Sequence, residues 1–200
     1  MNDRRARVAV FISGSGTGLQ AFIDASRSGI LHADIALVVS SNSKAYGLER
    51  AAKAGIETLV FKVKKYESPQ AGAEDLLRTL KAHGIEYIAL AGYLKLIPLE
   101  IVRAFPGRMV NIHPALLPKY GGKGMYGHFV HEAVLAAGDK ESGCTVHVVD
   151  EIYDHGRILA QGKVAVQPGD TPDTLAARVQ AEEHKLYPRV LQKLLKGEYT

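Results

Sequence analysis

The sequence predicts an α/β protein with a Rossmann-like, mostly parallel sheet and helices on both faces. Short β-branched segments alternate with helical patterns through the first half of the chain, which is typical of βαβ units. Two of these segments, VAVFI and IALVV, are almost continuously apolar, as strands covered on both faces are. After residue 140 the pattern changes, and we expect an antiparallel strand pair followed by a long final helix.

The expected elements can be placed along the chain. The strands are predicted at Arg7–Ile12, Ile35–Ser40, Glu57–Phe61, Tyr87–Ala91 and Met109–Ile112. The helices between them are predicted at Leu19–Arg27, Tyr46–Ala54, Gln70–His83 and Leu99–Phe105. CTVHVV and ILAQGKVAV are expected to form the antiparallel pair. The last helix should run from Thr171 to Leu195, with Thr171 as its N-cap and Pro172 at its first position.

Composition limits the class of protein. The 200 residues, 46% of them hydrophobic, suffice for one ordinary core, and we expect a single domain over residues 1–200. The net charge of +4 comes mainly from the N-terminal tail and from Lys62–Lys65, which favours solvated surface over a nucleic-acid stripe. The single cysteine, Cys144, excludes an internal disulfide, and no apolar run approaches the roughly 18 residues of a membrane span. We therefore expect a cytoplasmic protein without nucleic-acid or membrane partners.

A glycine-rich loop follows the first strand, in ISGSGTGLQAF. Glycines let a ligand approach the backbone, and the N-terminus of the next helix favours an anion. A Walker A loop would need a lysine that is missing, and a dinucleotide fingerprint would need G-x-G-x-x-G rather than G-x-G-x-G. A phosphate monoester passes both tests, while a tight turn that only packs strand on helix is the alternative.

The segment NIHPALLP ends the fifth expected strand with two polar side chains. Alternation puts Asn111 and His113 on one side of the strand end, where open α/β sheets bind ligands. An amide beside an imidazole suits a developing oxyanion, although His113 could equally be structural. A carboxylate nearby would favour the charged imidazole, and the downstream loop DEIYDHG offers Asp150, Glu151 and Asp154. Spacing alone does not choose among these three acids.

Five segments in this order give the chain a resemblance to a known family. ISGSGTGLQAF, AGYLKLIP, NIHPALLPKYGG, GCTVHVVDEIYDHG and AARVQAEEHKLYP look like the phosphoribosylglycinamide formyltransferases, folate-dependent enzymes of purine biosynthesis within the formyltransferase superfamily. The resemblance covers essentially the whole chain. NIHPxLLP with a downstream D-x-G belongs to the wider superfamily, whereas the glycine loop and the RVQxxEH segment narrow it to this family.

The resemblance implies functional residues. Asn111, His113 and Asp154 match the catalytic trio, and Gly16, Thr17 and Gly18 match the loop for the substrate phosphate. Gln180 and Glu183 match positions that bind the sugar of the glycinamide substrate. The folate-binding positions that the resemblance implies are Leu94, Lys95, Leu96, Ile97, Asn111, Asp150, Glu151, Ile152, Tyr153 and Asp154.

The resemblance also implies the chemistry. The primary amine of 5'-phosphoribosylglycinamide (GAR) would attack the formyl carbon of the cosubstrate 10-formyltetrahydrofolate, giving formyl-GAR and tetrahydrofolate in the third step of purine biosynthesis. Asn111 and protonated His113 would stabilise the oxyanion, and Asp154 would keep His113 charged. No metal is expected, because the folate already carries an activated formyl group. The partners are small molecules, and the protein would be a monomer or a homodimer.

Several residues have plainer interpretations. The family usually has Asn where Gly18 stands, and the GGKGMYG loop is longer than usual, with Lys123 more simply solvated than ligand-binding. His128 and His131 are spaced for a metal but lack a nearby third ligand. Cys144 is expected in the core, and His147, on the opposite face of the same strand, is assigned no role.

Three rival functions can be stated. A methionyl-tRNA formyltransferase would need an added C-terminal nucleic-acid-binding domain, and a formyltetrahydrofolate hydrolase an N-terminal regulatory domain. A phosphate-binding module without catalysis would explain the glycine loop but leave Asn111 and His113 unused.

Overall fold

The computed structural model describes residues 4–199, and the chain divides into two compact units that meet between Val110 and Asn111. The first unit holds four parallel strands in the order β3-β2-β1-β4: β1 (Ala6–Ile12), β2 (Ala33–Ser40), β3 (Thr58–Val60) and β4 (Tyr87–Leu90). The residues Val8 to Ile12 are fully buried, which explains the uninterrupted apolar pattern of this strand.

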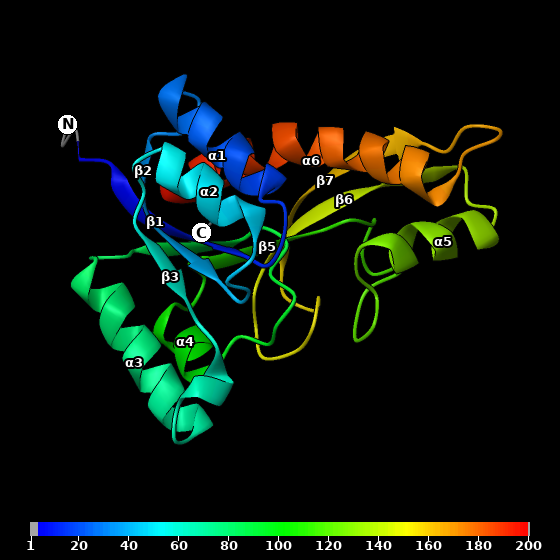
Figure 1. The fold of residues 1–200 in the computed structure, drawn as a ribbon. Coiled ribbons are helices and arrows are strands. Elements are labelled where there is room, and N and C mark those ends of the chain that lie inside the picture. Colours follow the sequence, from blue (N-terminus) through cyan, green and yellow to red (C-terminus); the bar gives the residue numbers. More distant parts are fainter. Residues whose placement is uncertain (1–3, 200) are drawn as a thin grey trace. The chain divides into compact units, whose positions relative to one another are not determined.

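Helices cover both faces of these strands, as predicted. Figure 1 shows α1 (Thr17–Arg27) and α2 (Tyr46–Lys53) on one side and α3 (Pro69–Ala82) and α4 (Leu99–Ala104) on the other. A short 3-10 turn, η1, at Val63–Lys65 precedes α3. Strand β5 (Met109–His113) contains the boundary between the units.

The second unit contains the antiparallel pair that the sequence predicted. Strands β6 (Glu141–Val148) and β7 (Ile158–Ala165) pair with a register shift between Val146 and His147. The long helix α6 (Pro172–Leu195) packs against them and against α5 (His128–Ala136). The α/β fold class with a mostly parallel sheet, an antiparallel C-terminal pair and a long final helix is thus confirmed.

Helix α6 begins where its capping residues place it. Thr171 Oγ1 accepts from the Thr174 backbone N–H at 3.3 Å, and Thr174 Oγ1 accepts from the Thr171 N–H at 3.0 Å. Pro172 occupies the first helical position, where its missing N–H costs nothing. None of the described helices is both long and apolar enough to cross a membrane.

The glycine loop is fixed by a close approach between two backbones. Gly16 has φ +71°, and a Cβ there would lie 2.5 Å from the Cα of Gly47 in α2. Helix α1 starts at Thr17, two residues before its predicted start, so Thr17 and Gly18 belong to its first turn. A Cβ on Gly18 would lie 3.2 Å from the Cβ of Ala91, which makes a larger residue crowded at this position.

We predict that Gly16→Ala destabilises the protein by about 1–3 kcal/mol or more, because it combines a left-handed backbone with a steric clash. Denaturant unfolding measures this loss. Gly14→Ala is the matched control, since a Cβ at Gly14 meets nothing within 4 Å. Equal stability of the two variants would contradict the packing described for this loop.

Candidate functional site

A cluster of polar side chains lies at the end of β5, in the second unit. The His113 side chain is 4% exposed, and its Nε2 donates to the backbone oxygen of Tyr120 at 2.7 Å. Its Nδ1 lies 3.5 Å from Asp154 Oδ2. The imidazole is thus held between a carbonyl and a carboxylate, two groups that only accept hydrogen bonds.

Asp154 connects three other groups of this cluster. Its Oδ2 also accepts from the Gly122 N–H at 3.0 Å, and its Oδ1 lies 3.5 Å from His147 Nε2. Only 11% of the Asp154 side chain is exposed. A buried carboxylate with several donors around it is an electrostatic anchor for its neighbours.

Of the three acids that the sequence left open, Asp154 is the one that approaches His113. Asp150 instead accepts from the Ile152 N–H at 2.9 Å and pairs with His155 at 3.2 Å, so it shapes the turn of its own loop. Glu151 is exposed.

His147 belongs to the cluster, although the sequence gave no reason to assign it a role. Its Nδ1 lies 2.9 Å from the carbonyl oxygen of Val148 and must donate to it. Its Nε2 lies 3.2 Å from Asn111 Nδ2 and 3.5 Å from Asp154 Oδ1, so this edge of the ring contacts both the amide and the carboxylate. His147 therefore orients Asn111 and leaves the second N–H of the amide for another partner.

The backbone is strained at this cluster. Within residues 4–199, Tyr120 and Asp154 are the two non-glycine residues with positive φ, at 57° and 52°. Such conformations cost about 1–3 kcal/mol and persist where surrounding contacts enforce them. Close packing fixes the D-x-G turn as well, since a Cβ on Gly156 would lie 1.9 Å from the Val148 oxygen.

Side-chain hydrogen bonds from β6 and β7 fix the NIHPALLP loop. The buried Thr145 hydroxyl donates to Ala115 O at 2.6 Å and accepts from the Leu117 N–H at 3.0 Å. Gln161 Nε2 donates to Leu117 O at 2.9 Å. The loop NIHPALLP, which contains two prolines, is thus held in place by a hydrogen-bond network that the sequence did not reveal.

Burial and neighbouring groups act in opposite directions on His113. Burial lowers the pKa of the imidazole, and the opposing effects of the Asp154 carboxylate and the Tyr120 carbonyl do not restore it. Burial raises the pKa of the Asp154 carboxyl, but the contact with His147, the charge of His113 and the Gly122 N–H together bring it below its ordinary value. Asp154 is therefore ionised, and its charge favours the protonated imidazole against the effect of burial.

The glycine loop of the first unit has features of an anion site. Gly16 is the N-cap of α1 and has a left-handed backbone. Because glycine has no side chain, the first N–H groups of the helix have no side-chain cap. Arg50, which the sequence did not single out, donates from Nε to Ser15 O at 2.9 Å and so lies beside the loop. Backbone N–H groups, a helix N-terminus and a guanidinium together suit a phosphate.

The segment Leu94 to Ile97 is also in the first unit and is tied to the end of β1. Ser13 Oγ accepts from the Leu94 N–H at 2.8 Å and shares a 2.7 Å hydrogen bond with Ser41 Oγ. Leu94 and Leu96 are 59% and 62% exposed, whereas Ile97 is buried. Lys95 is exposed.

The loop of Asp150 to Asp154, in the second unit, has a similar apolar surface, with Ile152 62% and Tyr153 52% exposed. On helix α6, Gln180 is exposed, and desolvation raises the pKa of Glu183 to about 7. Residues three apart lie on neighbouring positions of a helix surface, so one ligand can reach both.

The remaining candidates have structural partners or lie in the core. His128 pairs with Glu132 at 3.1 Å and with Asp173 at 3.5 Å, while His131 is buried. Among residues 4–199, no group of three or more His, Cys, Asp or Glu side chains is arranged to hold a metal. Cys144 packs in the core, and burial raises the pKa of its thiol to about 12. Lys123 is exposed.

We predict that Thr145→Val lowers the free energy of unfolding by about 1–3 kcal/mol, because it leaves the Leu117 N–H and the Ala115 carbonyl without their buried partner. Thr145→Ser keeps the hydroxyl and is the control. Denaturant titration compares the two variants, and a Val variant as stable as the Ser variant would exclude a role for this hydroxyl in holding the loop.

We also predict that the NMR titration midpoint of the His113 imidazole lies below 6.5, and lower still in Asp154→Asn. The second shift follows because the substitution removes the negative charge that favours the protonated ring. Asp150→Asn is the matched control and should leave the midpoint unchanged. A wild-type midpoint above 6.5, or no shift in Asp154→Asn, would contradict this description.

Comparison with known proteins shows which proteins this chain is similar to. The chain is 48% identical over 189 residues to a protein from Arabidopsis thaliana named phosphoribosylglycinamide formyltransferase, chloroplastic, covering 94% of this chain but only 65% of that protein. It is 39% identical to the phosphoribosylglycinamide formyltransferase of Haemophilus influenzae, covering 96% and 88% of the two chains.

A solved structure of a protein with the same kind of name has a similar fold. Glycinamide ribonucleotide transformylase 1 from Symbiobacterium toebii superposes with a TM-score of 0.91 at 40% identity, covering 98% of this chain and 90% of that one. The sequence model of the family described as formyl transferase matches residues 6–191, which cover most of each unit. The chain belongs to the formyl transferase family.

Proposed function

We propose that the protein transfers the formyl group of 10-formyltetrahydrofolate to the primary amine of GAR, in purine biosynthesis. The observation that carries this proposal is the buried cluster in which Asp154 and His147 position His113 and Asn111. The names of the relatives described above support the substrate and the reaction. We further propose that residues 1–200 act as one formyltransferase domain, which the family match across both units supports.

Attack of the amine on the formyl carbon places negative charge on the formyl oxygen. Asn111 is proposed to donate its second amide N–H to that oxygen, because the first is engaged by His147. His113 is proposed to donate as well, after its Nε2–H exchanges the Tyr120 carbonyl for the oxyanion. Negative charge developing beside the ring raises the pKa of His113, so the imidazole gains its proton during the reaction even though burial disfavours it beforehand.

A proton must also move from the attacking amine to the leaving folate nitrogen. Transfer through His113 or through a water is consistent with the cluster. Formyl-GAR and tetrahydrofolate are the products, and the donor set requires no metal.

The binding residues are proposed within each unit separately. In the first unit, Gly16, Thr17 and Gly18 bind the GAR phosphate, and the backbone of Leu94, Lys95, Leu96 and Ile97 binds the pterin ring. In the second unit, Asp150, Glu151, Ile152, Tyr153 and Asp154 border the folate, and Gln180 and Glu183 bind the sugar. The exposed apolar side chains of both folate segments support contact with an aromatic ligand.

Location and assembly are proposed from the sequence. We propose a cytoplasmic enzyme that works as a monomer or homodimer with small-molecule substrates and no nucleic-acid partner. The plant relatives are named chloroplastic, which is a property of those proteins.

We predict that His113→Ala and Asp154→Ala each lower kcat by about 100-fold or more while the protein stays folded, with a stability loss of about 1–3 kcal/mol in Asp154→Ala because the Gly122 N–H loses its partner. His128→Ala is the control, because its imidazole pairs with Glu132 and Asp173 outside the cluster. An absorbance assay of folate deformylation, with and without GAR, measures the rates. Wild-type turnover in either cluster variant would contradict the assignment of these residues.

The same assay separates the rival functions. Folate turnover without GAR would indicate a hydrolase, and no turnover with both ligands would indicate a binding module without catalysis. Turnover that depends on GAR is the result expected of the proposed transferase.

A further inference from the structure

The Tyr120 carbonyl occupies the N–H group of His113 that the proposed reaction needs. His113 Nε2 donates to the Tyr120 oxygen at 2.7 Å, and the imidazole is 4% exposed. A carbonyl oxygen only accepts hydrogen bonds, so this contact uses the Nε2–H for as long as it lasts. The carbonyl therefore caps a donor for which an oxyanion would have to compete.

The backbone that carries this carbonyl is strained. Tyr120 has φ 57°, in the left-handed region that a residue with a bulky side chain rarely adopts. A conformation of this kind costs free energy and persists only where neighbouring contacts enforce it. The next residue is Gly121, whose missing side chain lets the Tyr120–Gly121 peptide rotate more freely than most peptides do. Without a holding contact, the carbonyl would thus leave His113 at little cost.

The Tyr120 side chain supplies such a holding contact. Its hydroxyl donates to Asp139 Oδ2 at 2.9 Å, and its ring packs against the hydrophobic core that contains Val134 and Cys144. Asp139 lies in the turn between α5 and β6, so the hydrogen bond joins the loop after β5 to a different segment of the second unit. Because ring and hydroxyl are both held, the Tyr120 backbone has little room to turn.

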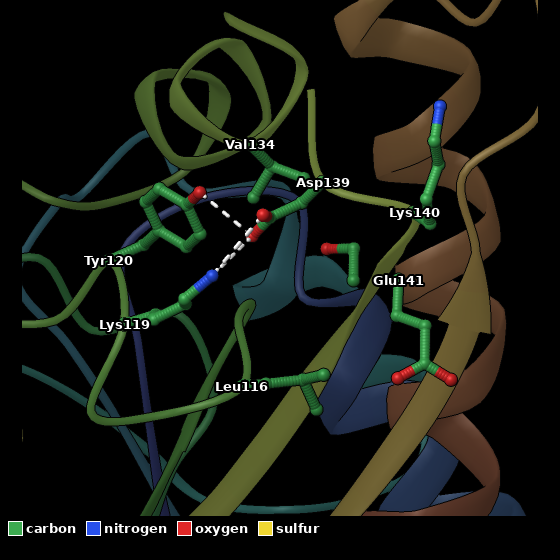
Figure 2. A pocket seen from close by; sticks show the side chains of 8 residues that line it. Leu116, Lys119, Tyr120, Val134, Asp139, Lys140 and Glu141 are labelled. Atoms are coloured by element: carbon green, nitrogen blue, oxygen red, sulfur yellow. Dashed lines mark hydrogen bonds and ion pairs between the residues drawn. The ribbon is translucent and has the colours of Figure 1, made fainter. Parts of the chain in front are cut away.

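Asp139 is itself held in place. Lys119 Nζ donates to its two carboxylate oxygens at 3.2 Å and 3.0 Å, and Figure 2 shows the Lys119 ammonium and the Tyr120 hydroxyl both directed at this carboxylate. Lys119 and the Tyr120 hydroxyl lower the pKa of the Asp139 carboxyl, whereas burial and Asp139 raise the pKa of the Tyr120 hydroxyl. At neutral pH a neutral hydroxyl therefore donates to an ionised carboxylate, and such charge-assisted hydrogen bonds are stronger than neutral ones.

We propose that Tyr120 and Asp139 are positioning residues that act on His113. Their hydrogen bond is a latch that holds the Tyr120 carbonyl on the His113 Nε2–H while no substrate is bound, and this contact must break before His113 can donate elsewhere. The latch thus lowers the fraction of free protein whose His113 is ready to react. Its effect on turnover rests on the proposed formyl transfer, whereas its effect on the His113 N–H does not.

Tyr120→Phe tests the latch, because it removes the hydroxyl and keeps the ring in its core contacts. The measured quantity is the rate at which the His113 Nε2 proton exchanges with water, followed by NMR of isotope-labelled protein, with His113→Ala to identify the signal. We expect Tyr120→Phe to speed this exchange by about threefold to tenfold, since it weakens the capped state by one hydrogen bond. An unchanged rate in Tyr120→Phe, or a wild-type proton too labile to observe, would overturn the proposal.

A double-mutant cycle separates the latch from a general loosening of the loop. Asp139→Asn should also speed the exchange, because a neutral amide oxygen accepts more weakly than a carboxylate. Combined with Tyr120→Phe it should add nothing, since the hydroxyl that donates to it is already gone. Tyr126→Phe, at a tyrosine that is 50% exposed, is the control and should keep the wild-type exchange rate. Additive effects of the two latch variants, or an equal effect of Tyr126→Phe, would overturn the latch.

Kinetics tests the consequence for formyl transfer. With GAR and folate both well below their KM values, most of the protein carries neither ligand. Transfer by Tyr120→Phe should then be faster than by wild type, by the same factor as the proton exchange. A merely structural hydroxyl would leave the rate unchanged or lower it, and either result would overturn the proposal. If the wild-type protein showed no GAR-dependent transfer, the proposed function would fail, whereas the exchange rates would still decide whether the latch exists.

Discussion

The buried carboxylate of Asp154 is the constraint around which the second unit's polar cluster is organised. It lies 3.5 Å from the imidazole of His113 and 3.5 Å from that of His147, and it accepts from the Gly122 N–H. To bring it there, the backbone of Asp154 adopts a left-handed conformation, and Gly156 passes close to the Val148 carbonyl. The protein tolerates this local strain because several groups depend on the resulting negative charge.

The consequences extend to the residues that would meet a substrate. His147 lies between Asp154 and the Asn111 amide, and His113 lies between Asp154 and the Tyr120 carbonyl. Thr145 and Gln161 hold the loop that follows His113, so the Asn111 amide keeps its place while His113 has only to release the Tyr120 carbonyl. Donors held in place suit an oxyanion, because little reorganisation is then required as charge develops.

The sequence predicted most of the fold, since the spacing of apolar residues shows which segments are buried strands and which are helices with one buried face. It also predicted that a strand ends at Asn111 and His113, because an apolar segment there gives way to polar residues and a proline. It did not reveal His147 or Thr145, because alternation along β6 says which face a side chain occupies but not which loop lies against that face. Spacing alone could not choose Asp154 over Asp150, and only the family resemblance named Asp154, since the choice depends on the left-handed turn at Asp154. The lowered pKa of His113 likewise follows from its burial in three dimensions.

A double-mutant cycle on Asn111 and Asp154 tests the central claim most directly, with kcat for formyl transfer measured in Asn111→Ala, Asp154→Asn and the double variant. If the two residues act as one unit through His147, the double variant loses little more than the worse single variant. If instead the losses multiply, each residue contributes independently, and the account of a cluster organised by Asp154 is contradicted.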